Sequence, residues 1–134
     1  VAAGYFAGLL LKDTQFFSYI KQSGPFDFNA ITTIPSTKRT DSGLIDESKE
    51  EDFKKYVLTL KEQGDSIGGQ VRLIIQNCPA ALGEPVFDKL KADLAKAMLS
   101  LPATMGFQIG SGFTGTGHIE GKYSMGRLDR APGQ

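Results

Sequence analysis

Residues 48–76 read SKEEDFKKYVLTLKEQGDSIGGQVRLIIQ and join the clearest helical pattern of the chain to its clearest strand pattern. Four apolar residues recur at helical spacing in the first half: Phe53, Tyr56, Val57 and Leu60. This i, i+3, i+4, i+7 stripe predicts a helix over 48–63 that packs one face against a core. Gly64 then supplies the left-handed residue at which helices commonly end.

Charged residues crowd the start of this predicted helix. Ser48 and Glu51 have the spacing of a capping box, in which each side chain satisfies a free N–H of the first turn. Residues of opposite charge stand four apart within 49–55, an arrangement that weakly supports a helix. We therefore interpret 49–55 as a solvated helix face and not as a binding patch.

The second half of the opening stretch alternates. Val71, Leu73 and Ile75 share one side of 70–76, which predicts a strand with one apolar and one partly polar face. Upstream, an Ala- and Leu-rich run with Phe6, Leu9 and Leu10 on one side predicts a helix over 2–12, and the aromatic run QFFSYI predicts a strand over 15–20. A long loop containing Pro25, Pro35 and Gly43 follows and carries Lys38 and Arg39.

Downstream, Pro85 stands where a helix can begin without needing an N–H. The apolar residues that follow it predict a helix that ends before Pro102: Val86, Phe87, Leu90, Leu94, Met98 and Leu101. A short strand is predicted over 105–109, followed by glycine-rich loops. The resulting order, helix–strand repeated three times, is typical of an α+β or α/β fold in which helices are layered on one face of a sheet.

The composition limits the function. The 134 residues include 15 Lys plus Arg and 15 Asp plus Glu, so the formal charge is zero, which argues against a nucleic-acid partner. No apolar run approaches the roughly 20 residues that span a bilayer, and the length suits one domain. The single cysteine, Cys78, excludes an internal disulfide and a cysteine-rich zinc site. We expect a soluble protein of the cytoplasm, or of the plastid in a plant, with no membrane or nucleic-acid partner.

Four places in the sequence are possible sites of chemistry. The turn GDSIGG at 64–69 could form an anion-binding nest of backbone amides, although a tight structural turn is the favoured interpretation. Glu84 and Asp88 stand at i,i+4 near a predicted helix start, where they are more simply stabilising charges. His118 lies in a glycine-rich loop without carboxylates or thiols at metal-ligand spacing, so no metal site is predicted. Cys78 is interpreted as a small buried thiol.

Several of these segments resemble one known family. GDSIGG at 64–69, Asn77, Pro79 and LGEPVFDKL at 82–90 are similar to the central region of chorismate synthases. The likeness continues at scattered positions: Ala92, Leu94, Ala95, Ala97, Ser100, Pro102, Ala103, Gly106, Ile109, Gly110, Gly112 and Phe113. The opening VAAG at 1–4 resembles the end of the family's Ser-Gly-Arg…Arg-Val-Ala-Ala-Gly signature. The resemblance is strong over 64–113, loose over 1–23 and weak elsewhere.

The chain also departs from the family pattern. The family's Pro-x-Gly-Leu-Gly reads PAALG at 79–83, its Lys-Gly reads Met105-Gly106, and its Gly-Asp-Gly-Phe reads GSGF at 110–113. The usual basic, proline-containing segment is replaced by residues 33–45, which removes the basis for assigning substrate contacts to that loop.

The resemblance implies a lyase of the shikimate pathway. Chorismate synthases release phosphate from 5-enolpyruvylshikimate 3-phosphate by an anti-1,4 elimination with reduced FMN, and NADPH is needed where the enzyme reduces its own flavin. The implied fold is a β-α-β sandwich and the implied assembly a homotetramer. The family holds flavin and substrate with histidines, arginines and an Asn-Ala-Gly-Gly segment, none of which matches a position between Val1 and Gln134. No catalytic, cofactor-binding or metal-binding residue is therefore assigned.

The two ends of the chain fit this expectation. Val1 opens inside an apolar helical pattern without an initiator Met, and Gln134 closes a loop. We expect residues 1–134 to be the central fragment of a larger domain, inactive alone and serving as scaffold and oligomer surface. The alternative is a free-standing α+β module that binds a ligand or assists assembly without enzyme activity.

Overall fold

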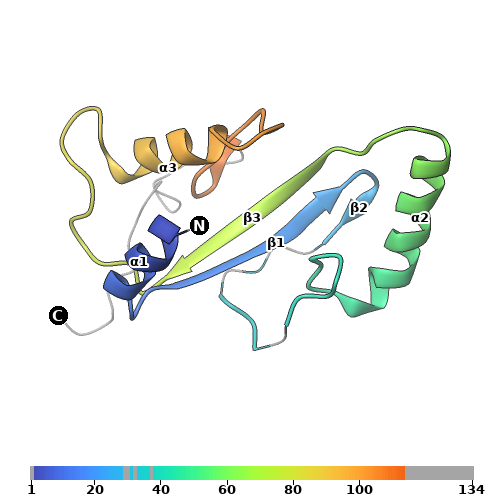
Figure 1. The fold of residues 1–134 in the computed structure, drawn as a ribbon, viewed down its shortest axis with the longest axis horizontal. Helices are drawn as coiled ribbons and strands as arrows, with labels where there is room; N and C mark the ends of the chain where they lie inside the picture. The colour runs from blue at the N-terminus through green and yellow to red at the C-terminus, as the bar shows by residue number, and fades with distance from the viewer. Residues whose placement is uncertain (1, 29–30, 32, 37, 114–134) are drawn as a thin grey trace, which may run out of the picture. The chain divides into compact units, whose positions relative to one another are not determined.

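A computed structural model of the chain describes residues 2–28, 31, 33–36 and 38–113 (Figure 1). The chain forms two compact units, residues 1–79 and residues 80–134. The first unit contains α1 (Ala2–Leu10), β1 (Gln15–Ser23), β2 (Phe26–Asp27), the 3₁₀ turn η1 (Glu47–Lys49), α2 (Glu50–Glu62) and β3 (Gly69–Gln76). The second contains α3 (Leu90–Leu99). Helices beside an antiparallel sheet confirm the predicted α+β class.

The sheet of the first unit has the strand order β2-β1-β3, and both pairings are antiparallel. The predicted strands over 15–20 and 70–76 are confirmed as β1 and β3, with Phe17 opposite Ile74 in the register. The two-residue strand β2 was not predicted, because it consists of only Phe26 and Asp27 after a tight turn. Gly24 makes this turn with φ +51°, which glycine adopts without strain.

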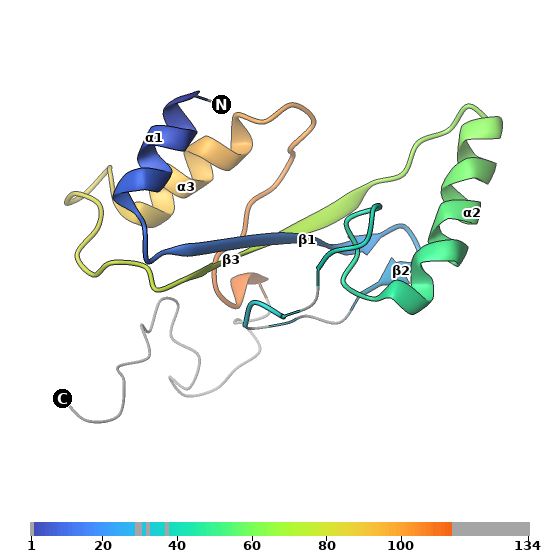
Figure 2. The ribbon, with the colours of Figure 1, turned by 60° about the horizontal axis from the view of Figure 1, so that its bottom comes forward.

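The core of the first unit lies between α2 and the β1–β2 hairpin, at the end of the sheet that carries β2 (Figures 1 and 2). Phe28, Leu44 and Phe53 are buried there. The ring of Phe53 meets those of Phe26 and Phe28 edge-on, at centroid distances of 5.5 and 6.0 Å. Full burial of one such ring stabilises the fold by about 1.5–3 kcal/mol, so the aromatic cluster fixes α2 on the hairpin.

The predicted apolar stripe of α2 is confirmed, because the stripe residues are buried or half-buried while the helix positions between them are exposed. The predicted start of the helix is wrong. Ser48 donates its N–H and its hydroxyl to Asp46 Oδ1, at 3.1 and 2.6 Å, so it is engaged by the preceding 3₁₀ turn. The residue at the N-cap of α2 is Lys49, which makes no side-chain capping bond. No capping box between Ser48 and Glu51 therefore forms.

α1 is the helix that the sequence predicts over 2–12, and it ends at Leu10. None of its residues is buried. Tyr5, Phe6 and Leu10 are each exposed over more than half of their surface. A helix that is apolar on all sides is normally covered by other protein, and α1 is not covered by its own unit.

The second unit differs most from the predictions. Residues 85–89 form a closed turn and not the first turn of a helix, because Glu84 N–H bonds to Asp88 O and Gly83 bridges to Lys89. Val86 lies in this turn with φ +66°, a conformation that excludes a helix. α3 therefore begins at Leu90.

The predicted strand over 105–109 is also wrong, since these residues form no ladder with another described segment. None of the helices in the described ranges is long and apolar enough to cross a membrane.

Candidate functional site

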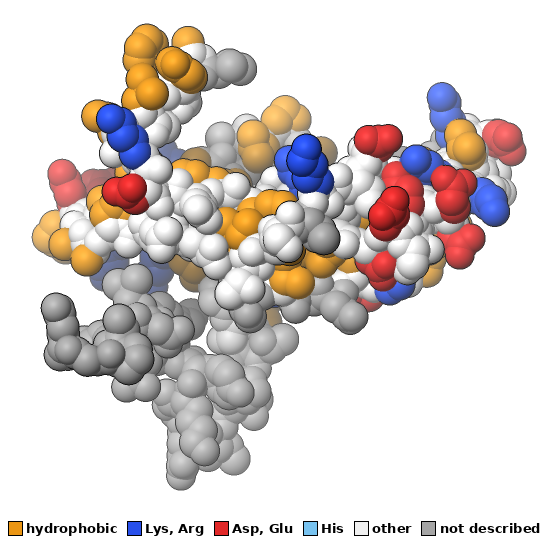
Figure 3. All heavy atoms as spheres, turned by 90° about the horizontal axis from the view of Figure 1, so that it is seen from below, with side chains coloured by type: hydrophobic (Ala, Val, Ile, Leu, Met, Phe, Trp, Pro, Cys, Tyr) orange, Lys and Arg blue, Asp and Glu red, His pale blue; other side chains and the backbone are white. Residues whose placement is uncertain are grey.

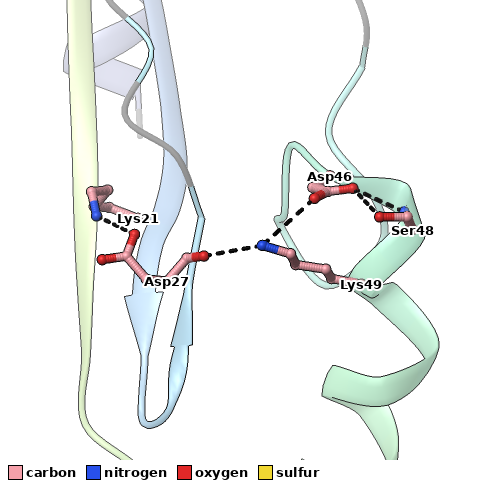
Figure 4. Close-up of polar contacts among 5 residues, drawn as sticks. All are labelled: Lys21, Asp27, Asp46, Ser48 and Lys49. Carbon is pink, nitrogen blue, oxygen red and sulfur yellow. Dashed lines mark hydrogen bonds and ion pairs between the residues drawn. The ribbon is translucent and has the colours of Figure 1, made fainter.

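Polar contacts of the first unit concentrate where the β1–β2 hairpin meets the start of α2 (Figure 4). Lys21 forms an ion pair with Asp27 across the hairpin. Lys49 donates to Asp27 O at 3.2 Å, lies 3.8 Å from an oxygen of Asp46, and places its ammonium 5.6 Å from the centroid of the Phe28 ring. Both ammonium groups thus have partners within the chain, and the cluster joins the β1–β2 hairpin to the start of α2.

Glu50 is a buried carboxylate at the start of α2, although the sequence places it in a solvated run. Its Oε1 accepts from Ser42 N–H and Ser42 Oγ, at 3.2 and 2.7 Å, and lies 3.1 Å from Lys54 Nζ. Hydrogen bonding from the Thr40 hydroxyl, then from Ser42 and Lys54, lowers the pKa of Glu50 to about 2. The carboxylate thus stays charged at neutral pH and holds the 40–44 loop against α2.

No sequence signal identifies this cluster, because Thr40 and Ser42 lie eight to ten positions before Glu50 and outside any periodic pattern. The i,i+4 pair of Glu50 and Lys54 is visible in the sequence. Its burial is not visible, since burial depends on how the loop folds back.

Arg39, one of the two cations in the long loop, lies against β1. Its Nη1 donates to Ser18 O at 2.9 Å and to Ser18 Oγ at 3.1 Å, and its guanidinium lies 5.7 Å from the centroid of the Phe17 ring. Arg39 and the neighbouring Lys38 are both exposed. Arg39 nevertheless contacts β1 through its guanidinium, which gives it a structural role.

The glycine-rich turn 64–69 behaves as a structural connection. Gly64 takes φ +70° and donates to Lys61 O, and Asp65 Oδ1 accepts the N–H of Ser66. The carbonyl of Gly68 accepts from Gly24 N–H at 3.1 Å, which ties the turn to the hairpin. Because the first amides of the segment are already bonded within the chain, they do not converge on an anion, and the structural interpretation is favoured over a nest.

In the second unit, residues of the segment 81–93 line an open surface depression of about 500 Å³. Its lining includes Glu84, Asp88 and Asp93, and no cation contributes to it among the residues described. Gly83 is required at its base, because a Cβ there would lie 2.5 Å from the N atom of Leu90. An acidic depression repels anionic ligands, so it does not suit a phosphate group.

The remaining candidates bring no chemistry together. Cys78 is half-buried and free, and no group of three metal-ligating side chains occurs in the part of the chain that the structure describes. His118 lies outside the described residues. Figure 3 shows the acidic and basic side chains intermixed over the end of the first unit that carries α2, without a single-sign patch on that face.

Comparison with known proteins decides the family. The sequence model of the chorismate synthase family matches residues 1–126. The chain is 46% identical over 122 residues to a chorismate synthase of Prochlorococcus marinus strain MIT 9301, and this match covers 87% of the chain. It is 42% identical to the chorismate synthase of Synechocystis sp. PCC 6803 and 38% identical to that of Synechococcus sp. RCC307, each over the same share of the chain.

The chain belongs to the chorismate synthase family. The resemblance noted in the sequence is thereby confirmed, and the match covers most of the weaker regions as well. The chain spans about one third of the length of these curated relatives.

The polar clusters and the depression described above do not fit the anionic flavin and substrate of a chorismate synthase. A phosphorylated dicarboxylate and the phosphate of FMN both need several cations held close together. Lys21, Lys49, Lys54 and Arg39 are each engaged by a partner within the chain. The acidic depression offers the wrong charge. No binding step is therefore derived from these residues.

Proposed function

We propose that the protein to which these residues belong converts 5-enolpyruvylshikimate 3-phosphate into chorismate and phosphate by an anti-1,4 elimination with reduced FMN. The observation that carries this proposal is the family match over residues 1–126. NADPH is a second cofactor in the case where the protein reduces its own flavin. We further propose that the protein acts in the cytoplasm, or in the plastid of a plant.

The role proposed for residues 1–134 is that of scaffold and oligomer surface within a homotetramer. Two features support it. Lys21, Arg39 and Lys49 join elements of the first unit. The apolar side chains of α1, among them those of Tyr5, Phe6 and Leu10, are exposed. The flavin and substrate sites are accordingly proposed to lie outside the described residues.

An activity assay tests this proposal. The purified 134-residue chain and the product of the complete reading frame are each mixed with 5-enolpyruvylshikimate 3-phosphate and reduced FMN, and chorismate is quantified. We expect chorismate from the longer protein only. If the longer protein is inactive, the proposed reaction is wrong, and the free-standing binding module becomes the better account. If the 134 residues alone form chorismate, their scaffold role is wrong.

A further inference from the structure

The outer edge of β3 is unpaired in the described part of the chain. Among the strands of the described residues, β1 lies between β2 and β3, so within this set β3 is hydrogen-bonded on one side only. Proline, charged side chains and bulges normally protect such an edge from pairing. β3 contains no proline and a single charged residue, Arg72, and its register shift lies on the β1 side of the pair, between Ile20 and Gln22. The edge is therefore a template for a further strand.

Two contacts of β1 reveal which backbone groups face away from β3. The N–H of Ile20 donates to Gly43 O at 3.1 Å, and the carbonyl of Ser18 accepts from Arg39. Neither Gly43 nor Arg39 belongs to β3. In a strand, the N–H and C=O of one residue point to the same side. Ser18 and Ile20 therefore direct their backbone groups away from β3.

The register of the β1–β3 pair shows which backbone groups of β3 point away from β1. Ser18 lies opposite Leu73 and Ile20 opposite Val71, so these are the pairs that exchange no hydrogen bonds with each other. On β3, the backbone groups of Val71, Leu73 and Ile75 consequently point to the outer edge, while those of the residues between them bond to β1. The side chains of the same three residues share one face, where Val71 is 73% and Leu73 38% exposed.

We infer that β3 pairs with β3 of a second copy of this chain, antiparallel and with Leu73 opposite Leu73 of the second copy. The two three-stranded sheets then join into one sheet of six strands around a twofold axis. Val71, Leu73 and Ile75 of each copy contribute their outward N–H and C=O groups to the new ladder. The inference rests on the geometry of β3 and not on the proposed reaction.

The side-chain pattern favours a second copy and this register. The run QVRLIIQ at 70–76 is nearly symmetric about Leu73, so Gln70 meets Gln76, and Val71 meets Ile75. Arg72 of one copy lies opposite Ile74 of the second copy and not opposite the second Arg72. A twofold axis through Arg72 would instead place two guanidinium groups opposite each other, which is destabilising. A twofold axis through Ile74 would place Val71 opposite residue 77, which lies beyond the end of β3.

The first test is the mass of the 134-residue chain in solution, measured by light scattering over a range of concentrations. We expect a concentration-dependent dimer of twice 14.5 kDa. Leu73→Pro removes one outward N–H without touching the β1–β3 ladder and should abolish the dimer, whereas Leu73→Val should retain it. Circular dichroism checks that both variants are folded. A monomer at every concentration, or a dimer that Leu73→Pro leaves intact, overturns the inference.

The second test does not depend on a proline variant that folds. In a Cys78→Ser background, Leu73→Cys places two thiols across a hydrogen-bonded pair with Cα atoms about 5.5 Å apart, within the range that a disulfide bridges. Ile75→Cys is the matched control, because its two copies would lie about 13 Å apart along the strands. We expect covalent dimers under mild oxidation from Leu73→Cys only. Equal cross-linking by both variants, or cross-linking by Ile75→Cys alone, overturns the register.

Discussion

At the scale of single residues, Glu50 is the side chain whose charge the structure makes most consequential. Its pKa is lowered from 4.5 to about 2 by the hydroxyl of Thr40, then by Ser42 and Lys54. A carboxyl whose pKa is lower in the folded state stabilises the fold above its unfolded pKa, and this contribution is lost as the pH falls through the folded pKa. The affected window is therefore about pH 4.5 to 2.

This yields the first prediction. Glu50→Gln removes the titrating charge, so the free energy of unfolding of the variant should fall less steeply between pH 4.5 and 2 than that of the parent chain. At pH 7 the variant should be the less stable of the two. Denaturant unfolding at a series of pH values measures both effects, and Glu51→Gln, at an exposed position on the same turn, is the control. Parallel pH profiles for the parent and Glu50→Gln would contradict the assigned role.

Gly24 supports the second prediction, because its φ is +51° and a Cβ would lie 2.4 Å from Ile67 Cδ1. Gly24→Ala should lower the free energy of unfolding by the strain of a left-handed alanine, roughly 1–2 kcal/mol, and by a further 1 kcal/mol or so from overpacking. Gly64→Ala is the matched control, since Gly64 has φ +70° and open space around it. Equal losses from the two variants in urea unfolding would show that the contact with Ile67 carries no weight.

At the scale of elements, α2 owes its position to one ring. The third prediction is that Phe53→Ala, which removes the edge-on contacts with Phe26 and Phe28, lowers the free energy of unfolding by about 3–5 kcal/mol. Leu58 lies on the exposed side of the same helix, and Leu58→Ala should change the free energy by less than about 0.5 kcal/mol. Thermal unfolding followed by circular dichroism compares the two. If Leu58→Ala lowered the free energy of unfolding as much as Phe53→Ala, the face of α2 that carries Leu58 would also have to contact the core, and the prediction would be wrong.

The elements also show what the sequence could predict and why the rest escaped it. α2 and β3 were predictable because their apolar residues repeat with the period of the element. The helix predicted from Pro85 failed because the bridge between Gly83 and Lys89 closes a turn first, a contact that periodicity does not encode. The strand predicted over 105–109 failed because a strand needs a partner for its backbone groups. The residue pattern of this segment does not indicate which other segment would pair with it. For the candidate sites, the sequence favoured a structural turn at 64–69, an interpretation that the hydrogen bonds of Gly64 and Ser66 support. It could not show that Glu50 is buried.

At the scale of the whole molecule, the chain combines a family assignment with an acidic depression and with four described cations that are engaged inside the chain. The family match extends over residues 1–126, yet the chain spans only about a third of its relatives. Neutral overall charge and internally paired lysines fit a scaffold better than a site for two anionic ligands. The central claim is therefore a division of labour, in which these residues shape the protein while others hold flavin and substrate.

Equilibrium binding of reduced FMN under anaerobic conditions tests this claim most directly. The 134-residue chain and the product of the complete reading frame are titrated side by side with the flavin, with and without 5-enolpyruvylshikimate 3-phosphate. The account predicts saturable binding by the longer protein and none by the 134 residues at the same concentrations. Saturable binding by the 134 residues with an affinity equal to that of the longer protein would contradict it.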